Sequence, residues 1–472
     1  MEYKNYQNYR AQLDNGSVTC LDTVNAYLNN IEKNAHLNAF LEVFSQDAVD
    51  QAKVVDQKIA EGTSGKLAGM VIGLKDNICY NGHKVSAASK ILEGFESIYS
   101  ATVVEKLLKE DAIIIGRLNC DEFAMGSSNE NSAFGEVSNP YDTNRVPGGS
   151  SGGSAVAVAA NLCMASLGSD TGGSIRQPAS YCGVVGLKPT YGRVSRHGLI
   201  AYASSFDQIG PFTSNVYDAG LLLEVIAGED EFDGTVSTKA IDNYTKLTNK
   251  KYKIAVLTDA VEHEALSPEI KSKFAEVIDD LKANGHEVAG VEFPYLDYLV
   301  PTYYVLTTAE ASSNLSRFDG VHYGYRSPNA TDLESTYRLS RTEGFGAEVK
   351  RRIMLGTFVL SAGYYDAYYN KGLKVRGLIA QKTQEIFKDY DFILLPTTAD
   401  VAFEKGGKSD DPIKMYLEDM YTVQANITGV PAISLPIGKS KEGLPFGLQL
   451  MSNHFTETDL LGLSKELMKE IY

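Results

Sequence analysis

Short apolar runs alternate with amphipathic helical stretches along this chain, and this alternation predicts a sheet with helices packed on it. The clearest case is 253–293, where the pattern predicts a strand, a helix over 268–284 and a second strand. In that helix, apolar residues recur at helical spacing and share one face: Ile270, Phe274, Val277 and Leu281. The other runs that we predict to be strands are 68–74, 112–115, 392–396, 432–436 and 446–451.

The first sixty residues are predicted to form helices. Apolar residues recur at helical spacing between positions 21 and 31. Ser17 is the predicted N-cap, because a serine hydroxyl accepts a backbone N–H of the first helical turn. A second helix is predicted over 47–60, and Gly62 ends it.

Composition and charge indicate an ordinary globular protein that does not bind nucleic acid by its overall field. Of the 472 residues, 43% are hydrophobic and 22% are charged, as in folded soluble domains. The formal net charge of −16 repels phosphate backbones. Contact with nucleic acid through a local basic patch or through a partner chain stays open.

Cysteine usage and hydropathy predict a cytoplasmic protein without a membrane anchor. The five cysteines are scattered and form no C-x-x-C pair, as expected for reduced thiols. The N-terminal residues lack the apolar core of a signal peptide. The longest apolar stretch, 155–167, contains Asn161 and is shorter than the roughly 20 residues that span a bilayer.

Two glycine-flanked serine clusters, GGSSGGS at 148–154 and GSDTGGS at 168–174, lie on either side of an apolar segment. The part after Gly153 is rich in helix-forming alanine, and 164–168 is strand-like, so a helix and a returning strand can bring the serine turns together. Glycine lets backbone N–H groups gather around one point, because it has no Cβ. We therefore predict an oxyanion hole built from the N–H groups of Thr171, Gly172, Gly173 and Ser174.

Other structures also use segments rich in glycine and serine. A flexible linker does not alternate with apolar strands and helices. A phosphate-binding loop needs G-x-x-x-x-G-K-[ST] or G-x-G-x-x-G, and neither occurs in this segment. A structural tight turn stays open. None of the seven histidines lies in the segment, so the spacing gives no support for a Ser-His-Asp triad, which can still assemble from distant positions.

A serine nucleophile needs a base, and Lys75 in GLKDN is the candidate. It follows the apolar run 68–74, at the end of a predicted buried strand where open α/β sheets place their chemistry. A buried lysine loses its charge more easily, and at a pKa of roughly 7–8 it can act as a general base. An exposed surface position is the alternative, which the preceding apolar strand disfavours.

These motifs resemble the pattern of the amidase signature family. The resemblance rests on GGSSGGS, on GLKDN and on the stretch 168–195. It implies that Ser174 is the nucleophile that accepts the acyl group and that Ser150 bridges it to Lys75. It also implies that this chain needs no metal or cofactor of its own.

Four further stretches are similar to family members that supply ammonia for tRNA-linked amidation: 121–135, 310–324, 348–369 and 410–436. This similarity implies glutamine as substrate, with Arg352 on its α-carboxylate and Asp419 on its α-amino group. Tyr303 is implied to line the same pocket, with the adjacent Tyr304 as alternative. The charges suit these roles, since a guanidinium matches a carboxylate and an aspartate complements an ammonium. Without the resemblance, Arg352 reads as part of a structural ion pair and Asp419 as a surface charge.

The resemblance also implies a fold and partners. We expect one α/β domain over 63–472, a large mixed sheet sandwiched between helices, with a helical segment over 1–62 packed on it. We expect a heterotrimer in which the other two members are of the B type and the C type. A partner would bind mischarged tRNA mainly by itself, hold ATP and Mg²⁺, and use the ammonia to amidate Glu-tRNA(Gln), with Asp-tRNA(Asn) as a further possible substrate.

Two other functions remain open. A stand-alone amidase of small amides would share the serines and the lysine but should lack the pair Arg352 and Asp419. An RNA-binding scaffold protein without catalytic activity would not need an intact Ser-Ser-Lys set, and the acidic charge argues against it.

Overall fold

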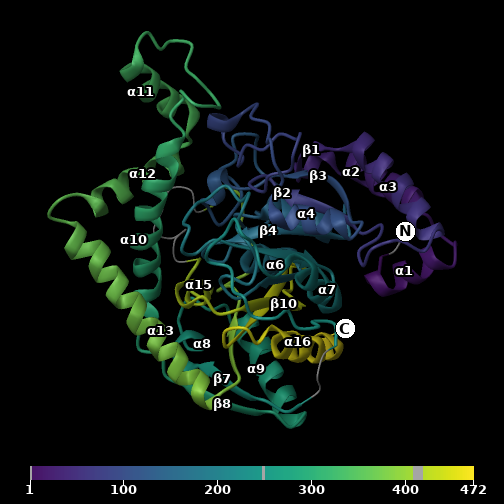
Figure 1. Cartoon of the computed structure of the whole chain (residues 1–472). Helices are drawn as coiled ribbons and strands as arrows, with labels where there is room; N and C mark the ends of the chain where they lie inside the picture. The colour runs from purple at the N-terminus through teal and green to yellow at the C-terminus, as the bar shows by residue number, and fades with distance from the viewer. Residues whose placement is uncertain (1–2, 247–249, 408–417, 472) are drawn as a thin grey trace.

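The computed structural model describes residues 3–246, 250–407 and 418–471 (Figure 1). The strands are β1 (Phe40–Val43), β2 (Val71–Lys75), β3 (Ile113–Leu118), β4 (Ala165–Asp170), β5 (Val185–Lys188), β6 (Gln208–Thr213), β7 (Lys253–Leu257), β8 (Glu287–Val291), β9 (Phe392–Pro396), β10 (Ala432–Lys439) and β11 (Pro445–Ser452). In the described residues they form a single 11-stranded sheet.

The α-helices are α1 (Tyr6–Asp14), α2 (Cys20–Lys33), α3 (Ser45–Ala60), α4 (Thr102–Lys109), α5 (Gly152–Ala159), α6 (Arg176–Cys182), α7 (Val216–Ile226), α8 (Thr258–Val261), α9 (Pro268–Ala283), α10 (Leu296–Asn314), α11 (Leu333–Gly344), α12 (Ala347–Leu360), α13 (Lys371–Asp389), α15 (Val423–Thr428) and α16 (Glu457–Ile471). Short helical turns are η1 (Ala35–Leu37), η2 (Lys90–Leu92), η3 (Glu122–Ala124), η4 (Leu315–Arg317) and the π-helical η5 (Tyr365–Asn370). None of the helices described is long and apolar enough for a bilayer-spanning segment.

The sheet is mixed, as predicted. Its strand order is β1-β3-β2-β4-β6-β5-β10-β11-β9-β7-β8. Strand β2 is parallel to β3 and β4, and β7 is parallel to β8 and β9. Antiparallel pairs connect these two groups through β6, β5, β10 and β11. Helix α6 packs on β5, β10 and β11, and Figure 1 shows β10 between α6 and α16.

The strands at the centre of the sheet are apolar on both faces because helices or loops cover both. Every residue of β2 and of β4 is buried, which explains why the run that leads into Lys75 is apolar without alternation. Ile72, Ile114, Leu167 and Leu448 are fully buried members of this core. Burying one such side chain contributes roughly 1.5–3 kcal/mol, so the core holds β2 firmly up to its last residue, Lys75.

Most predicted elements are confirmed. The unit over 253–293 is β7, α9 and the parallel strand β8, and β9 has the predicted bounds. In the N-terminal segment, two expectations were wrong. Thr19, not Ser17, is the N-cap of α2, since its hydroxyl accepts the Asp22 N–H at 3.0 Å. The segment is also not all helical, because 40–43 forms the edge strand β1. The domain boundary at residue 62 stays a prediction.

Three long helices form an arm beside the sheet and carry part of the site. Helix α10 packs against both α12 and α13. Figure 1 shows the three together on one side of the molecule, with α1, α2 and α3 on the opposite side. Helix α10 presents Tyr303 and Tyr304, and α12 presents Arg352, toward the buried interior.

Candidate active site

The two serine turns meet, as predicted. Helix α5 begins at Gly152, directly after Ser150 and Ser151, and β4 returns to the turn that carries Ser174. The Ser151 N–H donates to the Ser174 carbonyl oxygen at 3.3 Å. The turns are therefore joined through their backbones at the end of β2.

Lys75 ends β2 and is fully buried, so the surface alternative for this residue is wrong. Its Nζ donates to the hydroxyl oxygens of Ser150 at 2.7 Å, Ser151 at 2.8 Å and Ser169 at 2.9 Å. Burial lowers the pKa of Lys75 to about 8, although nearby acidic groups oppose the shift. A lysine with such a pKa exchanges protons with a hydroxyl group near neutral pH.

Ser151 and Ser169 complete the surroundings of Lys75, and the sequence analysis did not single them out. Ser169 also accepts a hydrogen bond from the Asn77 side-chain amide at 2.9 Å. The pairing of β2 with β4 explains why these serines lie near Lys75. Strands β2 and β4 run parallel with Leu74 opposite Leu167, so the residues that follow each of them reach the same edge of the sheet.

Ser174 lies at this edge and is buried, with 7% of its surface exposed. Within the described residues there is no hydrogen bond between the hydroxyl groups of Ser150 and Ser174. Catalytic hydrogen bonds are often long in a ligand-free enzyme and shorten when the substrate binds. The backbone link between the two turns places both serines for such a contact.

The turn before Ser174 is packed too tightly for any residue but glycine. A Cβ on Gly172 would lie 2.5 Å from the Tyr303 ring, and one on Gly173 would lie 2.2 Å from Thr422 Oγ1. Gly173 also has a φ of +134°, which favours glycine. Its N–H donates to Asp170 Oδ1 at 2.8 Å, so this predicted oxyanion donor already has a partner.

A buried ion pair holds the turn in place. Asp170 and Arg176 are both fully buried, and Arg176 Nη2 lies 3.0 Å from Asp170 Oδ1. Burial alone would raise the pKa of Asp170, but the guanidinium of Arg176 overrides it and holds the pKa at about 2. Asp170 also accepts the Ile175 N–H at 3.1 Å. The sequence motif contains this pair but gave no signal for its role.

Asp419 is buried beside the glycine turn, so its reading as a surface charge is wrong. Its carboxylate accepts from the Tyr304 hydroxyl at 2.7 Å and from the Ser127 hydroxyl at 3.1 Å. Burial raises the pKa of Asp419 to about 7. Three residues along the chain, Thr422 donates its hydroxyl to the Gly172 carbonyl at 2.6 Å. The segment of Asp419 is thus hydrogen-bonded directly to the turn that carries Ser174.

Arg352 lies against the same tyrosine. Only 2% of its surface is exposed, and its guanidinium carbon lies 5.1 Å from the centre of the Tyr304 ring. Its Nη1 donates to the Tyr202 hydroxyl at 2.9 Å, and its Nε pairs with Glu348 at 2.8 Å. Arg352 is therefore part of an ion pair. Its buried guanidinium also contacts Tyr304, whose hydroxyl donates to Asp419.

The adjacent tyrosines Tyr303 and Tyr304 have different neighbours at this site. The Tyr303 ring packs on Gly172, in the turn before Ser174, whereas Tyr304 contacts both Arg352 and Asp419. Together the groups offer a buried serine, a lysine of lowered pKa, and an anion and a cation on one wall. This arrangement suits acyl transfer from a small amide that carries both charges.

Comparisons with known proteins agree with this chemistry. A model of the amidase family matches residues 22–461, and the chain belongs to this family. Among curated relatives it is similar to the A-type chain of the glutamyl-tRNA(Gln) amidotransferase of Chlorobium phaeobacteroides, with 51% identity over 98% of each chain. The corresponding chain of Chlorobaculum parvum is 50% identical over 99% of this chain and 98% of its own length.

Solved structures show the same fold. The A-type chain of the glutamyl-tRNA(Gln) amidotransferase of Thermotoga maritima superimposes with a TM-score of 0.78 at 40% identity, over 95% of this chain and 93% of that one. The peptide amidase of Stenotrophomonas maltophilia gives a TM-score of 0.81 at 28% identity, over 98% and 96% of the two chains.

Proposed function

We propose that this chain hydrolyses the side-chain amide of glutamine and supplies the ammonia to a partner protein that amidates Glu-tRNA(Gln). The observation that carries the proposal is the contact of Arg352 and Asp419 with one tyrosine beside the turn of Ser174. A neutral amide has no use for two buried opposite charges, whereas the α-carboxylate and α-ammonium of glutamine match them. The same function is supported by relatives that are about half identical over nearly the whole chain, which are A-type chains of glutamyl-tRNA(Gln) amidotransferases.

In the first half of the reaction, Ser174 Oγ attacks the carbonyl carbon of the glutamine amide. The hydroxyl proton passes to Ser150, and Ser150 passes its own proton to neutral Lys75, 2.7 Å away. The negative charge that develops on the amide oxygen is held by backbone N–H groups. Thr171 and Gly172 are the proposed donors, because the N–H of Gly173 donates to Asp170.

In the second half, the tetrahedral intermediate collapses and the C–N bond breaks. Lys75, now an ammonium, returns a proton through Ser150 to the leaving nitrogen, which departs as ammonia. A γ-glutamyl ester remains on Ser174. A water molecule that loses its proton along the same path then attacks this ester and releases glutamate.

The ammonia needs an acceptor, and we propose a heterotrimer whose other two members are of the B type and the C type. In this proposal the partner holds ATP and Mg²⁺ and binds most of the mischarged tRNA, while the present chain supplies ammonia in the cytoplasm. Asp-tRNA(Asn) is a second proposed acceptor. The competing function is a stand-alone amidase of small amides, since the peptide amidase has the same fold.

Substrate specificity separates these two functions. Arg352→Ala and Asp419→Ala should each lower kcat/KM for glutamine by roughly ten- to a hundredfold, because a hydrogen bond to a charged group is worth about 1.5–3 kcal/mol. Hydrolysis of a small neutral amide should change little. Arg338→Ala is the control, since Arg338 is an exposed arginine on the neighbouring helix α11. Glutamate and ammonia release would be measured for each variant.

Equal losses on glutamine and on the neutral amide would mean that the two residues support the fold rather than recognise glutamine. The partner half of the proposal has its own test. The chain would be co-expressed with partners of the B type and the C type, and ammonia transfer to Glu-tRNA(Gln) would be measured with glutamine as donor. Full glutaminase activity without a stable complex or any transfer would favour the stand-alone amidase.

A further inference from the structure

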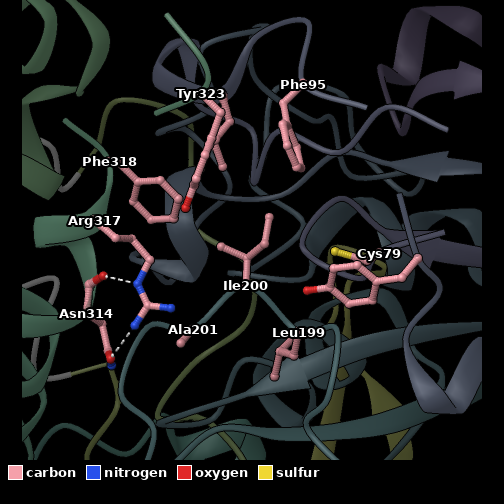
Figure 2. A pocket seen from close by; sticks show the side chains of 11 residues that line it. Cys79, Phe95, Leu199, Ile200, Ala201, Asn314, Arg317, Phe318 and Tyr323 are labelled. Carbon is pink, nitrogen blue, oxygen red and sulfur yellow. Dashed lines mark hydrogen bonds between the residues drawn. The ribbon is translucent and has the colours of Figure 1, made fainter. Parts of the chain in front are cut away.

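A second cavity, of about 130 Å³, lies outside the site described above (Figure 2). One wall comes from the loop that follows β2 and includes Phe95. The opposite wall comes from the end of α10 and from η4, with Arg317 and Phe318. None of its 11 lining residues is one of the serines, the lysine or the charged groups of the glutamine pocket.

The cavity combines an apolar lining with one cation. Phe95, Phe318, Tyr323 and Ile200 are among its lining residues, and Figure 2 shows their side chains around the open space. Arg317 is the charged side chain of the lining, and no aspartate or glutamate is among the lining residues. Such a surface favours a ligand with an apolar ring and a negative charge, and no positive charge.

The guanidinium of Arg317 has donors left for a ligand. Its Nε donates to the Asn314 carbonyl oxygen at 2.8 Å, and its Nη2 donates to Asn314 Oδ1 at 3.4 Å. Its Nη1 has no hydrogen-bond partner in the described part of the chain. Figure 2 shows the guanidinium extending toward Ile200 and Ala201. Asn314 therefore holds the guanidinium in place, while Nη1 can bind a carboxylate oxygen.

We propose that this cavity is a second binding site, for a small aromatic monocarboxylate such as phenylacetate. The ring lies among the side chains of Phe95, Phe318 and Ile200, and the carboxylate is bound by Arg317. The volume of about 130 Å³ is close to the roughly 150 Å³ of an apolar cavity that holds a benzene molecule, so it suits the ring alone, and the carboxylate lies at the mouth of the cavity beside the exposed Arg317. An aromatic amino acid binds less well, since its ammonium loses water without meeting an acidic group.

This inference does not depend on the proposed function, and it is tested by titrating the full chain with phenylacetate and following binding by calorimetry or ligand-observed NMR. We expect saturable binding that Arg317→Gln weakens by about tenfold or more, as for loss of one charged hydrogen bond. Arg338→Gln is the matched control, because Arg338 is an exposed arginine on nearby α11, and it should leave binding unchanged.

Two further measurements locate the site. Benzyl alcohol, which has the ring but no carboxylate, should bind weakly and equally to the parent chain and to Arg317→Gln. Glutamine should not compete with phenylacetate, and Ser174→Ala should bind phenylacetate as the parent does. Absence of saturable binding, unchanged affinity in Arg317→Gln with a normal melting curve, or competition by glutamine would each overturn the proposal.

Discussion

The rate of amide hydrolysis should rise steeply between pH 6 and pH 8, and more steeply for glutamine than for a neutral amide. Two buried groups set this dependence. Lys75 acts as a base only when it is neutral, and burial lowers its pKa to about 8. In the proposed mechanism Asp419 attracts the glutamine ammonium only when it is ionised, and burial raises its pKa to about 7. Raising the pH deprotonates both groups, so both effects have the same sign.

The magnitudes follow from the two pKa values. With a pKa of about 8, the neutral fraction of Lys75 grows from about 1% at pH 6 to about 50% at pH 8, roughly a fiftyfold gain in kcat/KM for any amide. The ionised fraction of Asp419 grows from about 9% to about 91% over the same range. For glutamine this adds a factor of up to about ten, which a neutral amide does not gain.

Initial rates of ammonia release, measured for glutamine and for a small neutral amide at constant ionic strength, would give both profiles. The Asp419→Ala variant should lose the extra steepness for glutamine and keep the profile for the neutral amide. A flat neutral-amide profile over this range would refute the role of Lys75 as a base. Profiles of the same steepness for both substrates would refute the role of Asp419.

Three other changes test the catalytic and structural assignments. Ser174→Ala should abolish hydrolysis with the fold intact, and mass spectrometry with a slowly hydrolysed substrate should find the acyl adduct of the parent chain on Ser174 and on no other residue. Lys75→Arg should be nearly as inactive, because a guanidinium cannot be deprotonated in this pH range; activity close to that of the parent would contradict a neutral base. Asp170→Asn should lower the free energy of unfolding by about 3–5 kcal/mol in chemical denaturation, since it leaves Arg176 buried without its partner charge. Asp14→Asn, in a largely exposed pair, is its control and should change stability by less than about 1 kcal/mol.

The parts of the fold that the sequence predicted are those where a local pattern decides the structure. Strand β9 and helix α9 have apolar patterns that no competing signal disturbs, and they were found almost to the residue. Strand β1 was missed, because four half-buried residues carry too short a pattern. The N-cap of α2 was placed two residues early, since Ser17 and Thr19 are equally good caps in isolation. Only the start of the helix in the folded chain decides between them.

The site was predictable where a residue type and its place on a strand coincide. Lys75 follows an apolar run, so both its burial and its place at the strand end were expected. The contacts of Asp419 and Arg352 were not predictable from local pattern, because they join α10, α12 and the segment before α15. The same holds for the Gly173 N–H, whose partner Asp170 became evident only in the folded turn.

One physical cause, burial, shifts the pKa values of both the proposed base and the proposed substrate-binding anion. Removing a group from water disfavours its charged form, so it lowers the pKa of Lys75 and raises that of Asp419. The two pKa values therefore approach each other around neutral pH without any direct contact between the groups. Asp170 is equally buried, yet the guanidinium of Arg176 keeps it ionised. The glycine turn is thus held by an ion pair that stays charged near neutral pH. The protonation states of Lys75 and Asp419, the groups proposed to act on the substrate, change with pH in the same range.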